Sequence, residues 1–154
     1  SSGSVYVLGT VGDPSFGDAN PAIVYWLDGV LHEVGTGGYV DAGSLHLTDE
    51  SVIVTGTTWD FIDYWGQNPR PNIWVDDEGV PLTTGDSVIR SSRFDGETLL
   101  TAGYSTDPVT DEDQGEVIVC RPMPGEVTPI TCTVFTSPDM VSQELNSLVQ
   151  VEDF

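Results

Sequence analysis

The sequence contains no lysine, and its only basic side chains besides two histidines are four arginines. Against these stand 25 acidic residues, so the formal net charge at pH 7 is −21. Nucleic acids and anionic membrane surfaces attract clustered Lys and Arg, so the composition argues against both partners. Such a charge favours a soluble chain, cation binding, or a salty medium that screens the repulsion between like charges.

Long apolar runs and catalytic motifs are also missing. No segment approaches the roughly 18 apolar residues of a membrane-spanning helix, so we expect no membrane insertion. The sequence has no Gly-x-Ser-x-Gly elbow for a nucleophilic serine. Its two histidines, His32 and His46, lie in alternating segments typical of strands, where we expect structural roles. Only the abundance of carboxylates would support an acid/base pair such as Asp60 and Asp63. We therefore predict that the protein is not an enzyme.

What the sequence does contain is one segment written three times. Ser4–Gly9, Ser51–Gly56 and Thr98–Gly103 begin at intervals of 47 residues. Each is a short aliphatic or β-branched run that ends in glycine, which is typical of a buried strand followed by a turn. A fixed period in the 40s indicates a repeat architecture.

The spacing predicts one repeat domain, residues 1–136, with units at 4–50, 51–97 and 98–136. Each unit offers four short antiparallel strands separated by polar loops and tight turns, which is the content of one β-propeller blade. In the second unit, residues 57–71 are predicted to form a long loop. We therefore expect an all-β fold of three four-stranded, blade-like repeats.

Three units are fewer than the roughly four to eight blades of a closed propeller, and open edges and faces are liabilities in water. Three alternatives would cover these edges and faces. The chain is part of a longer one, it associates with other copies, or it forms an open β-sandwich. The tail, residues 137–154, breaks the pattern. Ser137 and Pro138 can begin a helix over residues 138–147. The alternative is a strand at residues 148–151 that completes a blade or pairs with a neighbouring molecule.

The units resemble uncharacterised β-propeller repeats of bacterial secreted proteins and lipoproteins, of the type VYVAG followed by YWKNG. The first unit matches through Val5–Gly9 and Tyr25–Gly29, and the second through Val52–Gly56 and Trp74–Gly79. The third departs, with Cys120 in the place of the tryptophan. The resemblance implies a propeller-like fold and an extracellular or cell-surface location, but no activity.

The two cysteines, Cys120 and Cys132, lie twelve positions apart on either side of Pro124-Gly125. If that dipeptide turns a hairpin, the thiols lie on neighbouring strands and can form a disulfide. A bridge would indicate an oxidising compartment, whereas a pair of buried thiols in the cytosol is the alternative.

Four aromatic residues in the 57–71 segment are the best binding candidates. Flat apolar faces beside amides and carboxylates suit contacts with carbohydrate or protein. The alternative is that these rings cover an open blade face. The candidates are Trp59, Phe61, Tyr64 and Trp65.

Acidic residues crowd one loop of the third unit and suggest a calcium site. An EF-hand is excluded, because counting from Asp111 its sixth and twelfth positions hold Glu116 and Pro122 instead of glycine and glutamate. An irregular surface site for calcium remains as an expectation. Its candidate ligands are Asp107, Asp111, Asp113 and Glu116.

Together these features predict a non-enzymatic, extracellular structural or adhesive repeat protein that assembles with copies of itself into an oligomer or filament. The alternative is a carbohydrate- or protein-binding module centred on the 57–71 segment.

Overall fold

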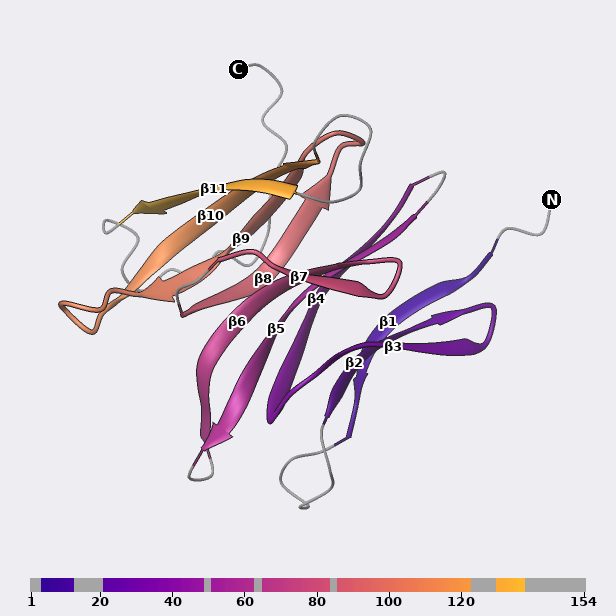
Figure 1. The fold of residues 1–154 in the computed structure, drawn as a ribbon, viewed down its shortest axis with the longest axis horizontal. Helices are drawn as coiled ribbons and strands as arrows, with labels where there is room; N and C mark the ends of the chain where they lie inside the picture. The colour runs from indigo at the N-terminus through magenta and orange to yellow at the C-terminus, as the bar shows by residue number, and fades with distance from the viewer. Residues whose placement is uncertain are drawn as a thin grey trace.

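A computed structural model describes residues 4–12, 21–48, 51–62, 65–83, 86–122 and 130–137. The predicted all-β class is confirmed, because these residues form strands and turns and no helix (Figure 1). The predicted tail helix lies outside the described residues. The strands are β1 (Tyr6–Val11), β2 (Ala22–Leu27), β3 (Val30–Thr36), β4 (Tyr39–Leu47), β5 (Val52–Ile62), β6 (Trp65–Val75), β7 (Glu78–Pro81), β8 (Ser87–Phe94), β9 (Leu99–Thr106), β10 (Asp113–Pro122) and β11 (Ile130–Ser137).

The strands form three antiparallel sheets, each a simple meander in chain order. Sheet A is β1-β2-β3, sheet B is β4-β5-β6-β7, and sheet C is β8-β9-β10-β11. Figure 1 shows sheet B between the other two, so the described residues form an open row of sheets and not a closed propeller.

The sheets do not coincide with the predicted units. The fourth strand of the first unit, β4, pairs with β5, and the fourth strand of the second unit, β8, pairs with β9. The two pairings have the same register 47 residues apart: Leu45 lies opposite Val54, and Ser92 lies opposite Thr101. Each also has an irregularity at the same place, after Ala42 in β4 and after Ile89 in β8. Every four-stranded sheet therefore begins with the strand that ends the preceding unit.

The prediction of a loop at residues 57–71 was wrong. The strands β5 and β6 run through this segment and pair as far as Ile62 opposite Trp65. The polar residues that suggested a loop include Thr57 and Thr58, whose branched side chains fit a pleated strand well. Asn68 takes a left-handed conformation (φ 53°), which asparagine tolerates better than most residues. The segment is therefore a long hairpin.

Aspartates close the hairpins of sheets A and B in the same way. The N–H of Asp28 donates to the carbonyl of Val5 (3.0 Å), and the N–H of Val5 donates to Asp28 Oδ1 (2.8 Å). Asp76 makes the same two bonds with Val52, at 3.0 and 2.9 Å. Both aspartates have positive φ, as two-residue hairpin turns require.

Sheet C replaces this aspartate by a cysteine. Cys120 lies opposite Leu99, which is 47 residues after Val52, so the strand continues where the other hairpins turn. The tryptophan position is held by Ile118 opposite Thr101, just as Trp74 lies opposite Val54. The prediction that Cys120 replaces the tryptophan was therefore wrong by two residues.

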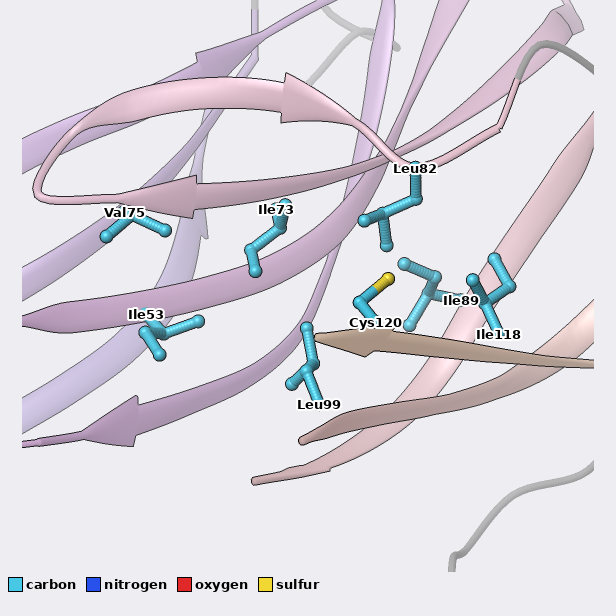
Figure 2. Packing of buried hydrophobic residues seen from close by; sticks show 8 residues of the cluster. All are labelled: Ile53, Ile73, Val75, Leu82, Ile89, Leu99, Ile118 and Cys120. Carbon is cyan, nitrogen blue, oxygen red and sulfur yellow. The ribbon is translucent and has the colours of Figure 1, made fainter. Parts of the chain in front are cut away.

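Two apolar cores hold the row of sheets together. Figure 2 shows the side chains that meet between sheets B and C: Ile53, Ile73, Val75, Leu82, Ile89, Leu99, Ile118 and Cys120. The core between sheets A and B contains Ile23, Tyr25, Val40, Val54 and Trp74. Sheet B therefore buries apolar side chains on both of its faces.

Hydrogen bonds also join sheets B and C. Thr55 Oγ1 and His46 Nε2 each lie 2.8 Å from Ser92 Oγ, and the N–H of Ile89 donates to Thr57 Oγ1 at 2.9 Å. Burial lowers the pKa of His46, because the charged imidazolium loses solvation there. His46 therefore takes part in the hydrogen bonds between sheets B and C.

A glycine in sheet A makes room for the tryptophan of sheet B. A Cβ atom at Gly35 would lie 2.4 Å from Cζ2 of Trp74, which is itself buried. We expect Gly35→Ala to lower the free energy of unfolding by about 1–3 kcal/mol, the usual cost of overpacking a core. Denaturant unfolding measures this. Gly9→Ala is the matched control, because its Cβ would meet Trp26 at an ordinary 3.4 Å. Equal stability of the two variants would contradict the packing of sheets A and B.

Candidate functional site

The two cysteines form a disulfide, as predicted. Cys120 and Cys132 lie directly opposite each other on β10 and β11, with their Cα atoms 4.1 Å apart. The described residues contain no free cysteine. By the loop-entropy estimate, a bridge across twelve positions contributes about 3 kcal/mol to stability. The bridge ties the last described strand to the rest of sheet C.

The predicted calcium ligands do not come together. Asp107 caps its own turn by accepting the N–H groups of Val109 (2.7 Å) and Thr110 (3.1 Å), and these bonds lower its pKa. Asp113 accepts the hydroxyl of Thr106 at 3.0 Å, Asp111 has a left-handed backbone, and Glu116 is buried on β10. In the described ranges, no three His, Cys, Asp or Glu side chains are grouped to hold a metal ion. The structure therefore gives the calcium expectation no assembled ligand set.

The predicted aromatic site is described only in part. Trp59 lies on β5 opposite Tyr39 of β4, and the two rings meet edge to face with centroids 5.0 Å apart. Tyr39 is exposed. The side chains of Phe61, Tyr64 and Trp65 lie outside the described residues, although the backbone of Trp65 begins β6. The described part of this site is therefore an aromatic pair on a strand hairpin.

A polar cluster that the sequence did not reveal joins sheets A and B. The Tyr25 hydroxyl donates to Asp77 Oδ1 at 3.0 Å, and His32 Nδ1 lies 3.3 Å from Asp77 Oδ2. The rings of Tyr25 and His32 stack, with centroids 4.5 Å apart. Asp77 has φ 71° in a turn where the first hairpin has Gly29. An acidic residue in a glycine position was the one sequence signal that could have indicated this cluster.

Among the described residues, no sheet covers one face of sheet A, whereas sheet B is covered on both faces. Tyr6 and Leu8 pack toward sheet B, so Val5 and Val7 point to the opposite, outer face. Val7 lies opposite Trp26, and Trp26 lies opposite Leu31. We call Val5, Val7, Trp26 and Leu31 the outer face of sheet A.

The equivalent residues of sheet B show what normally covers this face. Val54 lies opposite Trp74 as Val7 lies opposite Trp26. Val54 is 1% exposed and Trp74 is 5% exposed, because sheet A packs on them. Val7 is 51% exposed. The same position in the same type of strand is therefore buried in one sheet and open in the other.

The opposite end of the row presents a second apolar face. Cys120 and Ile118 of sheet C point toward sheet B, so Val117 and Val119, which alternate with them along β10, point outward. Phe135 is opposite Val117 on this side and is 57% exposed. We call Leu100, Val117, Val119 and Phe135 the outer face of sheet C.

The edge of sheet A is also incomplete. In sheets B and C the strands β4 and β8 pair with β5 and β9. Among the residues that the structure describes, no strand pairs with the corresponding edge of β1. Sheet A therefore has three strands where its neighbours have four.

No protein-family model, curated protein or solved structure matches this chain. In the described part of the chain, no helix is long and apolar enough to cross a membrane. Inferences about function therefore start from the two outer faces, the open edge and the aromatic pair.

The contact between sheets A and B can be followed through the ionisation of Tyr25. Burial, and next the hydrogen bond to Asp77, raise the pKa of Tyr25 from 10.0 to about 12. Between these values the unfolded chain has lost the proton that the folded chain keeps, so stability falls as the pH rises through this window. We expect Asp77→Asn to lower the pKa of Tyr25 while leaving it above 10.0, since burial is the larger cause.

Ultraviolet titration of tyrosinate measures this pKa, and Tyr25→Phe assigns the transition. If the transition near pH 12 persists in Tyr25→Phe, the contact is not as described here.

Proposed function

We propose that this chain is a non-catalytic structural module that assembles head to tail with copies of itself. The outer face of sheet C in one copy packs on the outer face of sheet A in the next. The observation that carries the proposal is the exposure of Val7 where the equivalent Val54 is buried by a neighbouring sheet.

The two outer faces complement each other because each corresponds to one side of an interface that already exists in the chain. The outer face of sheet A corresponds to the face of sheet B that sheet A covers. The outer face of sheet C corresponds to the other face of sheet B: Leu100 lies 47 residues after Ile53, which is buried in the core between sheets B and C. Stacking C on A therefore repeats a type of contact that the chain makes twice within itself.

Such a contact joins two different surfaces, so it forms rings if the rotation closes and filaments if it does not. The described residues of one copy form three sheets, and those of two copies form six, which lies within the roughly four to eight blades of closed propellers. The disulfide supports a place in an oxidising, extracellular environment. We therefore favour a structural or adhesive role outside the cell.

Charge opposes this assembly at low ionic strength. Each copy carries −21, so the approach of two copies is unfavourable until salt screens the repulsion. The Debye length falls from about 10 Å at about 0.1 M salt to about 3 Å at 1 M. We therefore expect oligomers to increase with sodium chloride concentration.

The test is a charge placed on the outer face of sheet A. We expect Val7→Glu to stay monomeric at about 1 M sodium chloride, where the unmodified chain forms oligomers, because the carboxylate would be desolvated in the contact. Light scattering after size-exclusion chromatography gives the masses. Val109→Glu is the matched control, since Val109 is 90% exposed in the turn between β9 and β10 and belongs to neither outer face as defined above. A single-chain mass for the unmodified protein at every salt concentration would overturn the proposal, as would equal assembly of the two variants.

A second candidate is carbohydrate or protein binding at the β5–β6 hairpin, which the exposed Tyr39 ring against Trp59 favours. If it holds, chitohexaose or cellohexaose quenches tryptophan fluorescence, and Trp59→Ala removes the quenching while Trp26→Ala retains it. Quenching that survives in Trp59→Ala, or none with the unmodified protein, would count against these glycans as ligands of this hairpin.

A further inference from the structure

The last strand of sheet C has one open edge. β11 pairs with β10 on one side, and no other described strand pairs with it; Figure 1 shows it at the border of the sheet. Its exposed residues are Thr131, Thr133, Val134, Phe135 and Thr136. Because side chains on both faces of the strand are exposed, a partner can reach its edge.

β11 lacks the features that usually protect an edge strand, which are charged side chains, prolines, bulges and short length. It has eight residues, none of them charged, and pairs with β10 without a register shift. The last strand of sheet A, β3, contains Glu33 and pairs with β2 across an irregularity. The last strand of sheet B, β7, has only four residues and includes Glu78 and Pro81. Of these three strands, β11 is therefore the one suited to pairing with another chain.

The spacing of the two cysteines shows which backbone groups face the open edge. Opposite residues of antiparallel strands have Cα atoms about 5.5 Å apart where they exchange hydrogen bonds and about 4.5 Å apart where they do not. The Cα atoms of Cys120 and Cys132 are 4.1 Å apart, so the N–H and carbonyl of Cys132 point away from β10. These directions alternate along the strand, so the same groups of Val134 and Thr136 also point to the open edge.

The charges beside this edge favour a partner with basic residues at one end. Gly115 lies opposite Ser137, so the beginning of β10 and the turn before it lie beside the end of β11. The exposed carboxylates there are Asp111, Glu112 and Asp113. At the other end, the exposed Arg121 lies opposite Thr131. Strands lie about 4.8 Å apart, so a strand added to β11 is about 10 Å from β10, roughly one Debye length at about 0.1 M salt.

We propose that the open edge of β11 binds an extended peptide segment of another protein, which pairs antiparallel with β11 and carries basic residues at its N-terminal end. Main-chain hydrogen bonds to Cys132, Val134 and Thr136 supply affinity, and the basic residues beside the carboxylates set the direction. At low ionic strength a second copy of this chain is a poor occupant, because each copy carries −21. The contact uses the edge of sheet C and does not depend on the proposed head-to-tail assembly.

The test removes one backbone donor from the open edge. The probe is a peptide of two arginines followed by alternating valine and threonine, with fluorescein at its C-terminus. Fluorescence anisotropy at about 0.01 M sodium chloride, where the Debye length is about 30 Å, measures binding. Val134→Pro deletes an N–H that points to the edge and leaves the bonds between β10 and β11, so we expect about tenfold weaker binding. Val134→Thr keeps the N–H and a branched side chain, and as the matched control it should bind like the unmodified protein.

Two further measurements do not depend on how Val134→Pro folds. A peptide with the two arginines moved to its C-terminal end should bind the unmodified protein more weakly, because its charges then lie away from the carboxylates. Asp111→Asn combined with Glu112→Gln should weaken binding of the first peptide. Glu78→Gln combined with Glu97→Gln removes the same charge from exposed residues elsewhere and should have a smaller effect.

The outcomes separate this proposal from the head-to-tail assembly. Equal binding of the two peptides, unchanged binding by folded Val134→Pro, or no binding by the unmodified protein would overturn it. If light scattering finds dimers at about 0.01 M salt that Val134→Pro abolishes, the edge pairs with a second copy and the peptide proposal is wrong. Val7→Glu, which tests the assembly at about 1 M salt, keeps the open edge of β11 and should bind the first peptide normally.

Discussion

Sheet B of this protein packs against a neighbouring sheet on each of its two faces. Consecutive residues of a strand point to opposite faces, and here consecutive residues are apolar. Ile53 belongs to the core between sheets B and C, and Val54 to the core between sheets A and B. The next strand repeats this, with Ile73 in one core and Trp74 in the other. Near-continuous apolar runs are the pattern of strands buried on both sides. Only sheet B has its two neighbours within the described chain.

The strands and the disulfide could be predicted because their signals are local. Short aliphatic runs, Asp-Gly turns and a hairpin between two cysteines each need only a few residues of context. The period of 47 residues gave the spacing of equivalent strands, but a period does not say which strand begins a sheet. The hairpin at residues 57–71 was missed because its glycine, asparagine and prolines are typical of turns, whereas the branched side chains of its threonines favour a strand.

The candidate sites were harder to predict, because they depend on what lies nearby in space. Asp77 is 52 residues from Tyr25 and 45 from His32, so no local pattern indicates their contact. Val7 and Val54 stand in nearly the same sequence context, yet one is exposed and the other buried. Val54 is buried because sheet A packs on that side of sheet B, whereas no described sheet packs on the corresponding side of sheet A. The acidic loop failed as a ligand set for a similar reason: each carboxylate is directed by its own strand or turn.

The position of the disulfide has a mechanical consequence. A pull on the chain beyond Ser137 would first peel β11 away from β10, one residue pair after another. The pairs between Ser137 and Cys132 would open in order, from Gly115 toward Cys120. At Cys132 the peeling meets a covalent bond to the neighbouring strand, so the force passes to β10 in the middle of sheet C. The bridge therefore limits how far tension can unravel this end of the row.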